Sequence, residues 1–74
     1  MPAPILRLSH AAIIELNDAR VVIRVAADSA DHAAIAKLFA GGGKCRLFNA
    51  DTLALIQLVE FKVDGDTTEW HAAI

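Results

Sequence analysis

The sequence predicts an α+β fold in which an antiparallel sheet packs on a single helix, within one domain spanning residues 1–74. Three observations support this prediction. Segments in which apolar and polar residues alternate, as in strands, lie on both sides of one segment with helical spacing. Turn-forming residues separate the segments and give the order ββαβββ. A small curled, barrel-like sheet with one helix is the alternative arrangement.

The first two strands are predicted over residues 5–16 and 20–26, joined by the turn-forming pair Asn-Asp at residues 17–18. The even positions of the first strand are apolar except for His10. We therefore expect His10 to be a hydrogen-bonded histidine of the core or of an interface. A bulge is expected near residues 11–12, and the two strands should form an antiparallel hairpin.

A helix is predicted over residues 29–40, which are rich in good helix formers. Asp28 or Ser29 can serve as its N-cap, and Gly41 is expected to end it in the left-handed conformation. Its apolar stripe consists of Ala34, Ile35, Leu38 and Phe39. The glycines and Lys44 follow this helix instead of preceding one, so they do not form a phosphate-binding loop.

Three more strands are predicted over residues 44–48, 52–63 and 67–74, with a turn at residues 49–51 after the first of them. The last two strands are joined at residues 64–65, Asp-Gly, which are expected to form a two-residue turn of type I′. The three strands should therefore follow one another as antiparallel neighbours.

The strand at residues 52–63 has apolar residues on both faces along its first half. A strand on the surface of a small sheet should instead alternate apolar and polar residues. A chain this short removes only about 60% of its surface from water, so it has little material to cover both faces. We expect a second copy of the chain to supply the cover, through this strand and the strand at 5–16. The centre of that interface is expected at Leu55, Ile56, Leu58 and Val59.

Composition excludes several classes of protein. The formal net charge of −2 and the aromatic content of 5% count against nucleic acid as a partner. No stretch of about eighteen uncharged apolar residues exists, so no membrane span is expected. The first residues lack the pattern of a signal peptide, and the single Cys45 cannot form an intrachain disulfide, so a cytoplasmic setting is expected. Oligomerisation is the remaining aid to stability for so small a chain.

Neither a metal site nor a catalytic site is expected. His10, His32 and His71 are spread over two strands and the helix without the spacing of metal ligands. Cys45 has basic neighbours but no positioned histidine, so it is expected to be a small core residue. We therefore expect no cofactor and no enzymatic activity.

The basic residues Arg20, Arg24, Lys44 and Arg46 fall at even positions of their strands, opposite the clearest apolar face. If these strands are neighbours, the four side chains form a strip suited to phosphate, a nucleotide or an acidic protein surface. A solvated outer face, on which they pair with Glu15 and Glu60, is the competing interpretation.

The sequence as a whole favours a small non-enzymatic interaction protein that acts as a homo-oligomer. It is also compatible with a second, different protein as a binding partner. Accessory proteins of phages and mobile elements, such as inhibitors of host defence and virion components, are a class with this description. The alternative is a protein that sequesters a small anionic ligand or nucleotide on its basic strip, at the boundaries between subunits.

Overall fold

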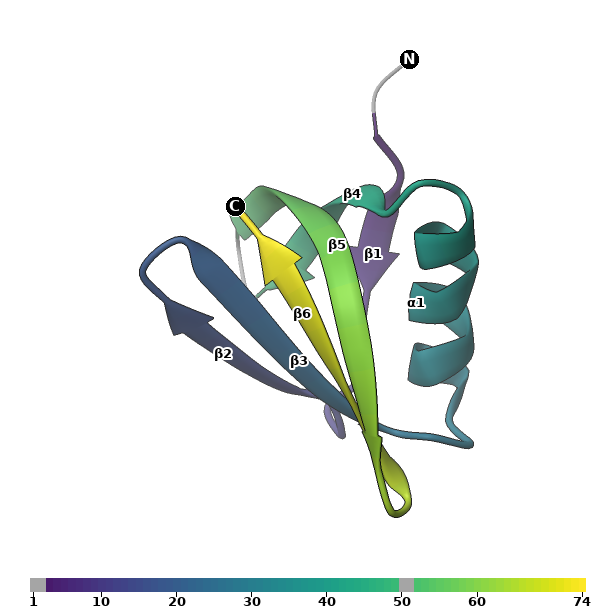
Figure 1. Cartoon of the computed structure of the whole chain (residues 1–74). Coiled ribbons are helices and arrows are strands. Elements are labelled where there is room, and N and C mark those ends of the chain that lie inside the picture. The colour runs from purple at the N-terminus through teal and green to yellow at the C-terminus, as the bar shows by residue number, and fades with distance from the viewer. Residues whose placement is uncertain (1–2, 50–51) are drawn as a thin grey trace.

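The computed structural model describes residues 3–49 and 52–74, so part of the predicted turn at residues 49–51 lies outside the described residues. Within the described part, the structure has six strands and one helix (Figure 1). The elements are β1 (Ile5–Arg7), β2 (Ile13–Asn17), β3 (Arg20–Ala26), α1 (Ala30–Ala40), β4 (Lys44–Asn49), β5 (Thr52–Asp64) and β6 (Thr67–Ala73).

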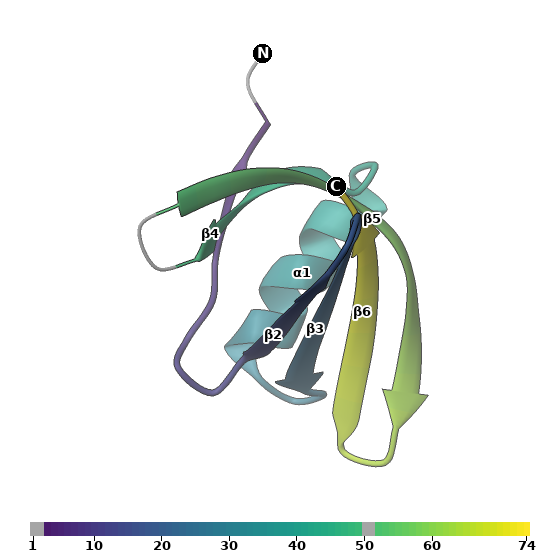
Figure 2. The same ribbon diagram turned by 90° about the vertical axis from the view of Figure 1, so that its left-hand side faces the viewer.

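The strands form one sheet in the order β1-β4-β5-β6-β3-β2. The sheet curls into a half-barrel, and α1 lies on its concave side (Figure 2). The expectation of an α+β fold with one helix on a sheet is confirmed, and the curled form of the alternative is present. The expectation of a wholly antiparallel sheet is wrong, because β1 pairs with β4 in parallel while the other neighbours are antiparallel.

The single strand expected at residues 5–16 is instead two strands, β1 and β2, at opposite edges of the sheet. The segment between them crosses from one edge to the other, which no bulge can do. Ser9 holds this crossing: its carbonyl accepts from the Ala12 N–H at 3.2 Å, and its hydroxyl accepts from the Ala11 N–H at 3.3 Å. His10 lies in the resulting turn and is exposed, so its expected place in the core is wrong, whereas a place in an interface stays a prediction.

Helix α1 begins where the sequence indicates, since the Ser29 hydroxyl accepts from the backbone N–H of His32 at 3.1 Å. Its end differs from the expectation. Gly41 has a φ of −87°, and the left-handed angles fall on Gly42 and Gly43. The expected left-handed cap at Gly41 is therefore wrong by one residue. The Gly43 N–H still reaches back to the Leu38 carbonyl at 2.9 Å, which closes the last turn.

The core lies between α1 and the concave face of the sheet. The side chains buried there are Leu6, Val21, Ile23, Val25, Ile35, Cys45, Leu47, Ile56, Leu58, Trp70 and Ala72. Trp70 is the largest of them, and its ring packs against Phe61 and Phe39, with centroids 4.7 and 5.4 Å away. Of the predicted helical stripe, Ile35 is fully buried, Leu38 and Phe39 are half-buried, and Ala34 is exposed.

The two hairpin turns that lie wholly within the described residues each have a two-residue loop. In β2–β3 the loop residues are Asp18 and Ala19, and Asp18 adopts a φ of 50°, as its side chain allows. In β5–β6 the loop residues are Gly65 and Asp66, one position later than expected. Only Gly65 has a positive φ, which matches type II′, so the expected type I′ turn is wrong.

Candidate functional site

The structure separates the two faces of β5. Ile56 and Leu58 point toward α1 and are only 1% and 3% exposed, so the expectation that they lack cover and centre an interface is wrong. Their own chain buries them because the curl of the sheet brings Leu6 and Trp70 into the same core. Leu55 and Val59 point away from α1 and are exposed. In the first half of this strand, up to Val59, the exposed apolar side chains therefore lie on the convex face of the sheet.

Two rows of paired residues bring apolar side chains together on this convex face. The first row runs from Leu55 on β5 through Arg46 to Ile5 on β1. The second row runs from Leu53 through Phe48 to Arg7. Paired residues of neighbouring strands project from the same face, so these side chains share one surface. We call Ile5, Phe48, Leu53 and Leu55 the outer patch.

Cations border the outer patch. The Arg7 guanidinium carbon lies 4.7 Å from the centroid of the Phe48 ring, a cation–π contact that keeps the charge above the patch. Arg46 donates from Nε to the carbonyl of Ala3 at 2.9 Å and is half-buried between Ile5 and Leu55. Among residues 3–49 and 52–74, neither of the two rows contains an acidic residue. This half of the convex face is therefore apolar and positively charged.

The four basic residues predicted to form a strip all lie on the convex face, but they do not converge. Lys44 and Arg20 stand at the two ends of one row that crosses β5 and β6, three strand spacings or about 14 Å apart. Arg24 is already bound by two carboxylates, at 2.6 Å from Glu15 and 3.2 Å from Glu69. The competing interpretation, in which the basic residues pair with glutamates on a solvated face, therefore holds for Arg24.

The ion pairs around Arg24 include a histidine. The Glu69 carboxylate also contacts His71 Nε2 at 2.7 Å. The His71 hydrogen bond is the main cause that holds the pKa of Glu69 below its ordinary value, with Arg24 adding to it. The hydrogen bond that Arg24 donates to the Glu15 carboxylate is the main cause that raises the pKa of Arg24. These groups stabilise one another and leave Arg24 occupied, so they do not form a site for an anion.

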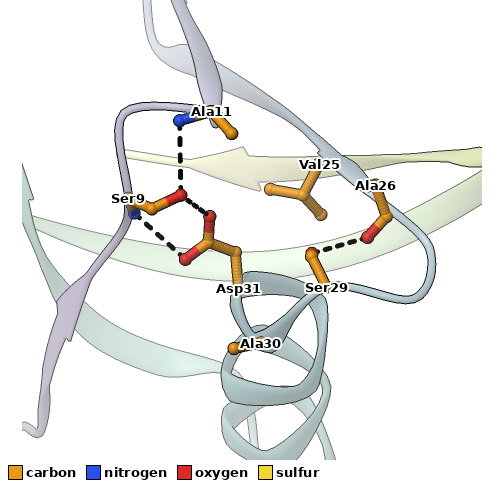
Figure 3. A pocket seen from close by; sticks show the side chains of 7 residues that line it. All are labelled: Ser9, Ala11, Val25, Ala26, Ser29, Ala30 and Asp31. Atoms are coloured by element: carbon orange, nitrogen blue, oxygen red, sulfur yellow. Dashed lines mark hydrogen bonds between the residues drawn. The ribbon is translucent and has the colours of Figure 1, made fainter.

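A small cavity of about 150 Å³ opens where the crossing segment meets the start of α1 (Figure 3). Asp31 from the first helical turn accepts two hydrogen bonds from Ser9, one from its N–H at 3.0 Å and one from its hydroxyl. On the other side, the Ser29 hydroxyl donates to the Ala26 carbonyl at 2.6 Å. Both hydroxyls and the carboxylate are occupied by one another or by backbone, so the cavity is a structural junction.

The histidines and the cysteine are not brought together. Among the residues that the structure describes, no group of three His, Cys, Asp or Glu side chains can hold a metal ion. His32 instead packs beside Trp70, with ring centroids 5.6 Å apart. Cys45 is a free thiol in the core, as the sequence indicates, and burial raises its pKa.

Comparisons with protein-family models, with curated proteins and with solved structures found no match for this chain. Within the described residues, no helix has the length and apolar character needed to cross a membrane.

Sequence reasoning missed three apolar members of the patch, Ile5, Phe48 and Leu53, and the cation Arg7. Ile5 and Arg7 join it because β1 pairs with β4, which follows it by almost forty residues. A signal for Leu53 was present, since it shares the odd positions of its strand with Leu55. The sequence alone did not show which of the two apolar faces of that strand α1 covers.

Proposed function

We propose that this chain is a non-enzymatic interaction protein that works as a homo-oligomer, and that the outer patch lies in the contact between copies. The observation that carries the proposal is the exposure of three large aliphatic side chains on one half of the convex face. Ile5 on β1 is 43% exposed, and Leu53 and Leu55 on β5 are 49% and 54% exposed. Only β4 lies between these two strands, and its Phe48 belongs to the same patch. Apolar groups gathered in this way mark interaction surfaces more often than single exposed leucines do.

Covering the patch contributes a modest free energy. About half of each side chain remains to be buried, which stabilises a contact by roughly 1 kcal/mol per residue. A stable interface buries about 800 Å² on each partner, so the contact must extend beyond the patch. Arg46 within the first row and Arg7 over Phe48 require acidic groups on the opposing surface, because a charge covered without a partner is costly.

Light scattering after size-exclusion chromatography tests the proposal. The unmodified chain should elute as a dimer or larger, and Leu55→Asp should elute as a monomer that retains its fold. Leu16→Asp is the matched control, since Leu16 is 58% exposed but lies on β2, at the far edge of the sheet. Leu16→Asp should leave the mass unchanged. A monomeric unmodified chain, or an assembly that only Leu16→Asp disrupts, would overturn the proposed interface.

A small anionic ligand is the second candidate. It is favoured by the gathering of Arg7, Lys44 and Arg46 on β1 and β4, in rows without an acidic member among the described residues. A thermal-shift screen with nucleotides, cyclic dinucleotides and inorganic phosphate at millimolar concentration tests it. Binding should raise the unfolding temperature, and Lys44→Ala with Arg46→Ala should remove the shift. An absence of any shift would remove this candidate.

The setting that we propose is the cytoplasm of a host cell, with the chain serving as an accessory protein of a phage or mobile element. The buried free thiol of Cys45 supports a reducing compartment. The assignment to accessory proteins rests on the small size of the chain. Recovery of the chain in purified virions would favour a virion component, whereas capture of a host defence protein would favour an inhibitor.

A further inference from the structure

A groove opens between the edge strand β1 and helix α1. It has a volume of about 460 Å³ and is lined by Ile5, Leu6 and Arg7 of β1 and by Ala34, Lys37 and Leu38 of α1. Four of these residues are apolar, and the remaining two are cations. The groove adjoins the outer patch, with which it shares Ile5, and no acidic residue lines it. We call it the β1 groove.

The hairpin turn between β5 and β6 has the complementary character. Asp64 and Asp66 flank the turn glycine and are exposed, and Val63 beside them is 66% exposed. Asp28 lies close to them, because it lines a shallow hollow together with Gly65 and Asp66. We call this region the acidic tip. It projects from the sheet as a narrow loop, whereas the β1 groove is concave.

The elements that line the β1 groove, β1 and the C-terminal half of α1, lie in the upper part of Figure 1, whereas the β5–β6 turn of the acidic tip lies at its bottom, so the two surfaces lie toward opposite ends of the molecule. The molecule is longest in one direction, 34 Å against 24 and 20 Å in the other two. A chain with a basic, apolar groove toward one end and an acidic, apolar projection at the other is complementary to a copy of itself placed end to end.

We propose that copies of this chain associate head to tail, the acidic tip of one copy entering the β1 groove of the next. Val63 meets the apolar lining of Ala34 and Leu38, and Asp64 and Asp66 pair with Lys37 and Arg7. This inference rests on the proposed function, since it specifies which surface of a second copy covers the basic, apolar end. It supplies the acidic partner groups that Arg7 requires.

A symmetric contact between two identical patches is disfavoured by charge. It would bring Arg7 and Arg46 of one copy toward the same residues of the other. The head-to-tail contact instead opposes unlike charges. It uses two different surfaces of each copy, so the assembly is either a closed ring or an open filament, according to the rotation between neighbouring copies.

Charge reversal at the two surfaces tests the inference. The tip variant carries Asp64→Lys with Asp66→Lys, and the groove variant carries Arg7→Glu with Lys37→Glu. All four side chains are exposed, so both variants should fold. Each variant alone should be monomeric, at 7.9 kDa. An equimolar mixture should recover the mass of the unmodified assembly, because reversed tips fit reversed grooves and unreversed tips fit unreversed grooves.

Glu60→Lys and Lys62→Glu are the controls, since they make the same charge changes at exposed positions of β5 outside both surfaces. Neither should change the mass.

High salt gives a separate test of the same contact. At about 1 M salt, where charges are screened beyond about 3 Å, the assembly of the unmodified chain should weaken.

The outcomes separate the two proposals. If the unmodified chain is monomeric, the proposed function fails. If the unmodified chain assembles, Leu55→Asp disrupts it and the tip variant still assembles, the head-to-tail contact fails while the proposed function stands. A mixture of folded variants that stays monomeric also overturns the head-to-tail contact.

Discussion

Leu55 and Ile56 are consecutive residues of β5, yet 54% of Leu55 is exposed and only 1% of Ile56. Helix α1 lies on the face of the sheet to which Ile56 points, and no element of the described chain lies on the other face at Leu55. Around these two residues, β5 therefore has buried core side chains on its concave face and exposed apolar side chains on its convex face. The proposed assembly follows from the exposed apolar side chains alone.

Alanine substitutions at these two positions should separate folding from assembly. Ile56→Ala should lower the free energy of unfolding by about 2–5 kcal/mol, because it leaves a cavity in the core. Leu55→Ala should change the free energy of unfolding of the monomer by no more than about 0.5 kcal/mol. Urea unfolding measured at low protein concentration checks both values. A large loss for Leu55→Ala would show that this side chain supports the fold of the monomer.

Gly43 should be the least replaceable of the three consecutive glycines. Its φ is 84°, and a Cβ there would approach the Leu58 carbonyl oxygen to 2.8 Å. Gly42 also has a positive φ, but nothing lies within 4 Å of its position for a Cβ. Gly42→Ala should cost about 1–2 kcal/mol from the backbone alone, and Gly43→Ala should cost more. Thermal unfolding of the two variants checks the order, and equal losses would contradict it.

The Ser9–Asp31 contact should hold the crossing segment to α1. Asp31→Ala removes both acceptors, and Ser9→Ala removes one donor, so each should lower the free energy of unfolding by about 1–3 kcal/mol. The double variant should cost less than the sum of the single variants, because the two groups share one interaction. A double-mutant cycle measured by urea unfolding checks this. Additive losses would show that the two groups act independently.

The Cys45 thiol should react with iodoacetamide only when the chain unfolds, because it is fully buried and its pKa is raised. The sign of the pH effect follows from the same shift. The folded state holds the thiol protonated while the unfolded state releases the proton, so its contribution to stability is present below the ordinary thiol pKa and is lost above it. Cys45→Ala should lose less stability between neutral and alkaline pH than the unmodified chain. Rapid labelling of the folded chain would contradict this account.

Local patterns in the sequence were sufficient for the helix and the hairpins. Ser29 caps α1 as expected, and the strands 20–26 and 67–74 were placed within one residue. These elements depend on neighbours in the sequence: a cap, a period of two or a turn. The type of the β5–β6 turn could not be read in the same way, because Gly65 suits both primed turns and the pairing register selects between them.

The features that escaped prediction depend on long-range pairing. The apolar even positions of residues 5–16 are typical of one strand. In the structure, Ser9 forms hydrogen bonds with Asp31 and the predicted strand is divided in two at this point, so His10 lies in a turn and is exposed. The outer patch likewise depends on long-range pairing, because β1 joins it only by pairing with β4. Along β5, a bulge between Leu58 and Glu60 transfers the inward face from even to odd positions, which is how Phe61 reaches Trp70. A simple alternation cannot reveal that shift.

The molar mass of the unmodified chain in solution at micromolar concentration tests the central claim most directly. Light scattering should give a dimer or larger assembly, that is, at least twice the 7.9 kDa of one chain. A folded species of 7.9 kDa at that concentration would contradict the claim that Leu55 and its neighbours are covered by a second copy.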